Sequence, residues 1–284
     1  MATFSIAGVQ MPVPIGGQNT QAMLERAMKA VHLYPWVDML LFSELALHGP
    51  SLSFTADDTT AIESPFRDFA AKHGIWICPG SYFLRRGDQI FNHAVVIDPT
   101  GEVVGRYDKM FPFQPYEQNV SAGDRFLLFD IPEVGRFGLS ICYDIWFPET
   151  TRSLVSNGAE VLLHPVLTGT TDRDAELAIA RATAAMFQCY VVDVNGLSAG
   201  GIGKSLICDP TGLIVHSAGE LDCIFPITLD LDLVRRTRLR GTNGLGQPLK
   251  SFRDSAVKFD VYRHESCTSY LDSLGPLHMP PRRA

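Results

Sequence analysis

The chain has 284 residues, of which 46% are apolar and 19% are charged, and this length and composition suit a protein with a sizeable buried core. The net charge of −7 disfavours nucleic-acid binding, because contact with phosphates needs a basic face. Six scattered cysteines without a Cys-x-x-Cys pair indicate reduced thiols. No segment is long and apolar enough to span a bilayer and the N-terminus does not resemble a signal peptide, so we expect a cytoplasmic protein.

Strand and helix patterns alternate through the first hundred residues. Apolar or alternating runs predict strands at 4–11, 37–42, 75–83 and 92–98. Apolar residues at helical spacing predict helices at 19–34 and 65–73. This alternation favours an α/β or α+β arrangement in layers over a helix bundle or a sandwich of sheets alone.

Two distant segments share a strand, an Asp-Pro-Thr-Gly turn and a second strand. The turns lie at residues 98–101 and 209–212. Proline fixes one turn position and glycine takes the positive φ, so both segments are predicted antiparallel hairpins. They are either equivalent hairpins in two halves of a duplicated architecture or a coincidence of a common turn sequence.

A short apolar strand at 137–141 ends at Cys142, and helices are predicted at 149–157 and 172–188. Further strands are predicted at 160–164, 190–194 and 223–233. We expect residues 1–284 to form a single domain. Its part from 235 to 284 is rich in Gly, Pro, Arg and Ser, which predicts an irregular arm that packs on a neighbouring subunit, although plain surface disorder fits the same composition.

Three chemically capable residues each follow a predicted strand, namely Glu44, Lys109 and Cys142. Side chains at strand ends can converge on one edge of a sheet. Each residue also has an ordinary interpretation. Glu44 would suit a helix start, Lys109 an exposed loop, and Cys142 a buried core position, since free cysteines are among the most buried residues.

Taken together, these residues resemble the nitrilase superfamily of carbon–nitrogen hydrolases, whose members use a Glu, a Lys and a Cys in that order. The resemblance covers about residues 3–232. The segments that carry it most clearly are Leu41-Phe42-Ser43-Glu44, Arg106-Tyr107-Asp108-Lys109-Met110-Phe111-Pro112-Phe113-Gln114-Pro115-Tyr116-Glu117 and Leu139-Ser140-Ile141-Cys142-Tyr143-Asp144. The implied fold is a four-layer α-β-β-α sandwich.

The resemblance also implies roles for these residues. Cys142 would be the nucleophile, Glu44 the general base, and Lys109 with the backbone N–H of Tyr143 the groups that stabilise the oxyanion. Glu117 resembles the family's second glutamate, which positions substrate or catalytic groups; a solvated loop carboxylate is the alternative. An amide would give a cysteine thioester and then an acid, with no cofactor, and the histidine spacing indicates no metal site.

Phe113, Tyr116, Trp146 and His164 are expected to form a mainly apolar substrate pocket, although core packing would equally explain Phe113 and Trp146. Tyr143-Asp144 after the cysteine favours a small, uncharged or aromatic amide. The alternatives are an N-carbamoyl-compound hydrolase, a nitrilase, and a non-catalytic binding or assembly relative. Members of the family pair through helices near the cysteine, so a homodimer or higher homo-oligomer is expected through helices 149–157 and 172–188, with no nucleic-acid or membrane partner.

Overall fold

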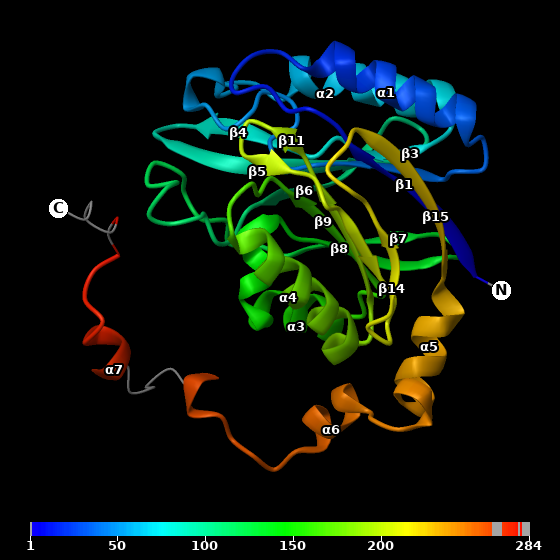
Figure 1. Cartoon of the computed structure of the whole chain (residues 1–284), viewed down its shortest axis with the longest axis vertical. Helices are drawn as coiled ribbons and strands as arrows, with labels where there is room; N and C mark the ends of the chain where they lie inside the picture. Colours follow the sequence, from blue (N-terminus) through cyan, green and yellow to red (C-terminus); the bar gives the residue numbers. More distant parts are fainter. Residues whose placement is uncertain (1, 263–268, 278, 280–284) are drawn as a thin grey trace.

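The computed structural model describes residues 2–262, 269–277 and 279 and contains two large β-sheets (Figure 1). The first sheet has the order β15-β1-β2-β3-β5-β4, with β6 paired to β5. Its strands are β1 (Thr3–Gln10), β2 (Met39–Phe42), β3 (Trp76–Cys78), β4 (Ser81–Arg86), β5 (Gln89–Ile97), β6 (Val103–Asp108) and β15 (Cys223–Asp230).

The second sheet has the order β14-β13-β10-β9-β8-β7. Its strands are β7 (Leu127–Ile131), β8 (Gly135–Leu139), β9 (Val161–Val166), β10 (Tyr190–Asn195), β13 (Leu206–Cys208) and β14 (Ile214–Ser217). A short ribbon of β11 (Leu197–Ser198) and β12 (Gly201–Ile202) lies outside both sheets. The predicted hairpins are confirmed as antiparallel, and one lies in each sheet, as β5–β6 and β13–β14.

Alternating side chains on each strand explain why the sheets are covered on both faces. On β2, Met39 and Leu41 join a core between the two sheets, which also contains Phe137 and Leu163 of the second sheet. Leu40 and its alternate neighbours face α1 (Thr20–Leu33) and α2 (Thr60–His73) instead. A third cluster packs α3 (Pro148–Ser156) and α4 (Asp172–Phe187) on the second sheet. The predicted four-layer α-β-β-α sandwich is therefore confirmed.

Several predicted boundaries differ from the structure. The strand expected at 75–83 is divided into β3 and β4 by Gly80, whose φ of 80° departs from extended backbone. The strand expected at 223–233 ends at Asp230, which caps α5 (Leu231–Arg240) by accepting from the Asp232 N–H. Strand β7 was not predicted.

The C-terminal arm begins later than expected, because residues 235–240 are part of α5. Leu231, Val234 and Thr237 bury one face of this helix. Beyond it, α6 (Pro248–Asp254) lies against α4, on the side of the molecule that carries α3 and α4 (Figure 1), and α7 (Ser269–Asp272) follows later in the chain. The remaining short elements are the 3₁₀ turns η1 (Leu52–Phe54), η2 (Cys142–Trp146), η3 (Thr242–Gly244) and η4 (Asp260–Tyr262).

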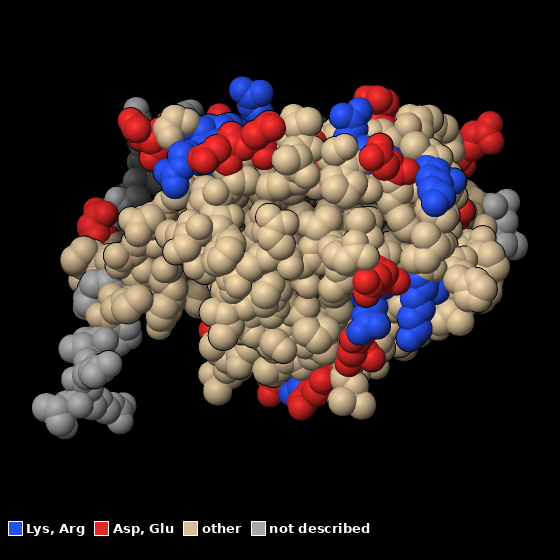
Figure 2. Space-filling model, turned by 90° about the horizontal axis from the view of Figure 1, so that it is seen from above, with Lys and Arg blue, Asp and Glu red and all other residues tan. Residues whose placement is uncertain are grey.

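The described surface carries charges of both signs close together. Figure 2 shows acidic and basic side chains interspersed along the edges of one face, with a broad uncharged area between them. No extended basic patch is visible on that face, in keeping with the net charge of −7. Among the described residues, no helix has the length and apolar character needed to cross a membrane.

Candidate active site

Glu44, Lys109 and Cys142 approach one another although they come from different sheets. Glu44 lies two residues after β2, and Lys109 directly follows β6, both in the first sheet. Cys142 follows β8 in the second sheet and begins the turn η2. The Glu44 N–H donates to the Val166 carbonyl at 3.2 Å, so backbone hydrogen bonding joins the sheets beside the site.

Cys142 has a left-handed backbone conformation, with φ of 47°. Such a φ is uncommon for a residue other than glycine and is maintained only by strong local contacts. The buried carboxylate of Asp144 supplies these contacts. Its oxygens accept from the Ile141 N–H at 2.9 Å, the Phe111 N–H at 2.8 Å and the Tyr107 hydroxyl at 2.7 Å. Asp144 thus joins the cysteine turn to the loop that carries Lys109.

A buried ion-pair network surrounds Lys109. Its Nζ lies 2.8 Å from Glu44 Oε1 and 3.0 Å from Glu117 Oε2. Burial would lower the pKa of Lys109, but the charges of Glu44 and Glu117 outweigh it and hold this pKa well above its usual value. The ammonium group therefore stays charged and can stabilise a nearby oxyanion.

Glu44 is held by two further hydrogen bonds. Its Oε1 accepts from Asn92 Nδ2 at 2.8 Å, and its Oε2 accepts from the Leu167 N–H at 3.0 Å. Burial raises the pKa of Glu44, while the charge of Lys109 lowers it in part. A carboxylate of raised pKa that lines the same cavity as a thiol is suited to take its proton.

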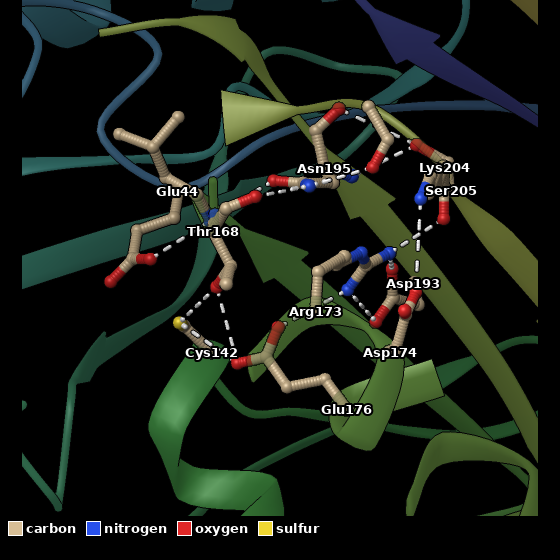
Figure 3. Close-up of polar contacts among 12 residues, drawn as sticks. Glu44, Cys142, Thr168, Arg173, Asp174, Glu176, Asp193, Asn195, Lys204 and Ser205 are labelled. Atoms are coloured by element: carbon tan, nitrogen blue, oxygen red, sulfur yellow. Dashed lines mark hydrogen bonds and ion pairs between the residues drawn. The ribbon is translucent and has the colours of Figure 1, made fainter. Parts of the chain in front are cut away.

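The Cys142 thiol is nearly buried, with 8% of the residue exposed. Its Sγ lies 3.5 Å from Thr168 Oγ1 and 3.9 Å from Glu176 Oε1 (Figure 3). Burial, and then the charge of Glu44, raise the pKa of this thiol well above its usual value. The resting sulfur is therefore protonated, and it needs a base at the moment of attack.

A cavity of about 270 Å³ opens over this sulfur. Its lining is mostly apolar and aromatic, with polar groups grouped around Cys142. The lining residues are Glu44, Leu45, Pro50, Phe83, Lys109, Phe113, Tyr116, Glu117, Cys142, Tyr143, Trp146, Leu167, Thr168, Gly169, Thr170, Asp172, Glu176, Ala199 and Gly200.

Three of the four side chains expected to contact substrate line this cavity, namely Phe113, Tyr116 and Trp146. The expectation for His164 requires correction, because His164 is not among the lining residues. It is 1% exposed on β9, and its Nδ1 lies 2.8 Å from Ser140 Oγ. Burial lowers its pKa to about 4, so His164 is a neutral core residue beneath the cysteine strand.

The sequence interpretation missed Thr168 and Glu176. Glu176 Oε1 lies 3.1 Å from Thr168 Oγ1 and accepts from Trp146 Nε1 at 3.4 Å. Glu176 lies in the first half of α4, where an acidic residue is ordinarily a solvated helix-start residue. Thr168 follows β9 without a recognisable motif. Only the packing of α4 beside η2 brings them to the sulfur (Figure 3).

The other described thiols lie away from this cavity. Cys78, Cys189, Cys208 and Cys223 are free, as expected for reduced cysteines, whereas Cys267 lies outside the described residues. In the described part of the chain, no three His, Cys, Asp or Glu side chains form a group suited to a metal ion.

Comparison with known proteins supports a family assignment. The sequence profile of the family described as "Carbon-nitrogen hydrolase" matches residues 5–239. A formamidase of Allorhizobium ampelinum is 28% identical over 81% of this chain and 72% of its own length. A 2-oxoglutaramate amidase of Bacillus subtilis is 30% identical over 68% of this chain and 78% of its own length.

A solved structure agrees with the fold. It is a mutant of an amidase from Nesterenkonia sp. AN1, in which acrylamide has added to the active-site cysteine by Michael addition. It superposes with a TM-score of 0.72 at 22% identity, over 83% of this chain and 97% of that one. With the profile match covering most of its length, this chain belongs to the carbon–nitrogen hydrolase family of the nitrilase superfamily and is an enzyme of that family.

Proposed function

We propose that this enzyme hydrolyses a small, uncharged primary amide to an acid and ammonia, with Cys142 as nucleophile. The observation that carries the proposal is the arrangement of one buried ammonium group, two carboxylates and one thiol around a single cavity. Lys109 Nζ contacts both Glu44 and Glu117, and all three residues line one cavity with Cys142. These are the groups that acyl transfer from an amide requires.

The first half of the reaction forms a thioester. Glu44 takes the thiol proton as Sγ bonds to the amide carbon, and Lys109 with the Tyr143 N–H stabilises the resulting oxyanion. When the tetrahedral intermediate collapses, the C–N bond breaks and Glu44 returns its proton to the departing nitrogen, which leaves as ammonia. Glu117 keeps Lys109 charged and accepts from the Phe113 N–H, so it also orders the cavity wall.

The second half of the reaction regenerates the thiol. Glu44 takes a proton from water, whose oxygen adds to the thioester carbon. Collapse breaks the C–S bond, the acid leaves, and the sulfur is protonated again from Glu44. A single base therefore serves both halves, and its raised pKa suits proton transfer in both directions.

The charges around the cavity favour an uncharged substrate. The acidic lining residues are Glu44, Glu117, Asp172 and Glu176, whereas Lys109 is the one basic residue among the lining residues. Lys109 is already engaged by two carboxylates. A substrate carboxylate would enter without a free cation to pair with, which is costly in a partly desolvated site.

Ammonia release over a panel of compounds tests this proposal, with Cys142→Ala as the blank. The panel contains formamide, acetamide, propionamide and benzamide, together with N-carbamoylglycine, an ω-amide that carries a carboxylate, and benzonitrile. We expect the uncharged amides to be hydrolysed with the highest kcat/KM. Turnover of the carboxylate-bearing compounds alone would overturn the substrate class, and nitrile hydrolysis at rates matching the amides would make the enzyme a nitrilase.

Trapping the intermediate tests the nucleophile separately. Hydroxylamine should divert the acyl group to a hydroxamate in the wild-type enzyme but not in Cys142→Ala. Peptide mass spectrometry after an acid quench and digestion should find the acyl adduct on the peptide that contains Cys142. An adduct on any other cysteine would refute the assignment.

We also propose a homodimer or higher homo-oligomer that uses α3 and α4. Met186 on α4 is 49% exposed, and the arm runs along the same side, where Arg152 of α3 stacks over Phe252 at 4.2 Å. We propose that the chain is a single domain and that this arm, from Gly241 onward, takes part in the association. Light scattering at working concentration tests the association, and a monomer there would contradict it.

A further inference from the structure

Glu176 is a buried carboxyl group beside the nucleophile that has no part in the mechanism above. Residue Glu176 is 5% exposed, and its Oε1 is shared by three neighbours: Thr168 Oγ1 at 3.1 Å, Trp146 Nε1 at 3.4 Å and Cys142 Sγ at 3.9 Å. In Figure 3 the sulfur lies between the Glu44 and Glu176 side chains. The thiol therefore has a second carboxyl group near it, besides the one proposed as base.

The Thr168 hydroxyl connects this carboxyl group to the sulfur. The Thr168 oxygen lies within hydrogen-bonding distance of both Glu176 Oε1 and Cys142 Sγ. A hydroxyl has only one proton to donate, so it can donate to one of these two atoms at a time. When Glu176 is ionised, the hydroxyl donates to the carboxylate, and Thr168 can only accept from the thiol. When the sulfur has lost its proton, the same hydroxyl can turn and donate to the thiolate.

We propose that Glu176 is a positioning residue for the nucleophile: through Thr168 it holds the Cys142 thiol protonated between turnovers, and it thereby sets the pH range in which the sulfur reacts. This inference rests on the proposed role of Cys142. The one proton that moves is that of the thiol, which passes to Glu44 when substrate is attacked, while the Thr168 hydroxyl turns from Glu176 to the sulfur.

The charges around Glu176 support a role in keeping the Cys142 thiol protonated. The ionisable groups facing it are Arg173 and Asp172 on α4, Asp193 on β10, Cys142 on η2 and, beyond the sulfur, Glu44 and Lys109. Arg173 Nη1 contacts Glu176 Oε2 at 3.4 Å, but both guanidinium nitrogens Nη1 and Nη2 also contact Asp193. The guanidinium group is thus shared, and it leaves Glu176 able to oppose a negative charge on the sulfur.

The electrostatic effects on the two groups agree with this geometry. Burial, and then the charge of Asp193, raise the pKa of Glu176 to about 7. Among the effects on the Cys142 thiol, the charge of Glu176 raises the pKa and the Thr168 hydrogen bond lowers it. Glu176 and Thr168 therefore act on the sulfur in opposite directions, which a purely structural role would not produce.

The experiment is the pH dependence of iodoacetamide alkylation at Cys142, followed by peptide mass spectrometry from pH 5 to pH 10. Glu176→Gln keeps an acceptor for Trp146 and Thr168 but removes the charge, so its alkylation midpoint should fall by roughly one pH unit. Thr168→Val keeps the shape but removes the donor to the thiolate, so its midpoint should rise. Thr168→Ser should restore the wild-type midpoint.

Glu63→Gln is the matched control, because Glu63 is a buried carboxylate paired with an arginine, Arg106, on the far side of the first sheet. Its alkylation profile should coincide with that of the wild type. Coincidence of the Glu176→Gln profile with the wild type, or shifts of Glu176→Gln and Thr168→Val in the same direction, would overturn the inference. If one of these variants does not fold, the sign of the other's shift decides the question alone.

Failure of this inference is distinguishable from failure of the proposed function. If Cys142→Ala retains amide hydrolysis, or if Cys142 is not the cysteine that carries the acyl group, the proposed function fails. If Cys142 is the acylated residue and its alkylation midpoint does not respond to Glu176 and Thr168, the role assigned to Glu176 fails by itself.

Discussion

The two sheets are built alike but contribute different chemistry. Each contains a hairpin with an Asp-Pro-Thr-Gly turn, and each buries one face against the other sheet and the other face under two helices. The first sheet supplies charge, through Glu44 and Lys109. The second sheet supplies the thiol of Cys142 with Thr168 beside it, and helix α4, which packs on that sheet, adds Glu176. The active site therefore forms only where the ends of strands from the two similar sheets come together.

The groups that activate the nucleophile and the nucleophile itself therefore belong to different sheets. A base and a cation from one sheet face a protonated nucleophile from the other, so neither sheet holds a reactive centre by itself. Glu44 also accepts from the Leu167 N–H of the second-sheet side, and Asp144 accepts from the Tyr107 hydroxyl of the first. These hydrogen bonds between the two sheets fix the positions of the catalytic groups relative to one another.

The largest expected effect comes from removing either partner of the activation step. Cys142→Ala should lower kcat for amide hydrolysis by about 10³-fold or more, because the covalent route is lost. Glu44→Gln should lower it by about 10²–10⁴-fold, because the amide cannot take the thiol proton. Steady-state ammonia release measures both. Near-normal rates in either variant would mean that the two sheets do not divide the chemistry in this way.

Removing the cation should damage stability as well as rate. Lys109→Met leaves the buried Glu44 and the half-buried Glu117 without their shared partner, at a cost of about 3–5 kcal/mol in the free energy of unfolding at pH 8. The loss should shrink at pH 5, because protonation removes the unpaired charge. Urea unfolding at both pH values measures it.

A comparison variant in α5, at a more exposed ion pair, sharpens that prediction. Arg235→Met breaks an ion pair with Glu160 whose arginine side chain is 45% exposed, so it should cost under about 1 kcal/mol. If Lys109→Met and Arg235→Met lower the free energy of unfolding equally, the buried ion pairs of Lys109 contribute no more to stability than a partly exposed ion pair.

The buried carboxyl group of Glu176 on α4 should give the free energy of unfolding a distinct pH dependence. Because burial and Asp193 raise the pKa of Glu176 from 4.5 to about 7, the folded chain retains a proton there that the unfolded chain has released. Stability from this group is present below pH 4.5 and is lost as the pH rises through 7. Between pH 5 and pH 8, the wild type should lose up to about 3 kcal/mol more than Glu176→Gln, as measured by urea unfolding. If the free energy of unfolding changes equally with pH in the wild type and in Glu176→Gln, the raised pKa assigned to Glu176 is wrong.

The smallest effects on catalysis should come from the two equivalent turns. Asp98 Oδ1 accepts from the Thr100 N–H at 2.8 Å, and Asp209 Oδ1 accepts from the Thr211 N–H at the same distance. Asp98→Ala and Asp209→Ala should each cost about 1–2 kcal/mol, with kcat/KM nearly unchanged. Thermal unfolding compares them, and a large difference between the two would show that the hairpins are not equivalent supports.

Much of this protein was determined by its sequence alone. Alternating apolar residues predicted most strands, and the residues around Glu44, Lys109 and Cys142 indicated the family, the four layers and the class of reaction. These features are readable because they depend on local periodicity, or on motifs that are contiguous in the chain.

Only the tertiary structure decided the surroundings of the sulfur. Glu176 has the local sequence of a helix-start residue, yet α4 packs it against η2 and beside the thiol. His164 follows an apolar strand like a pocket residue, yet its side chain turns to Ser140 under the sheet. Burial, hydrogen-bond partners and shifted pKa values depend on which distant elements meet, and that information lies in the packing of the two sheets rather than in any single stretch of residues.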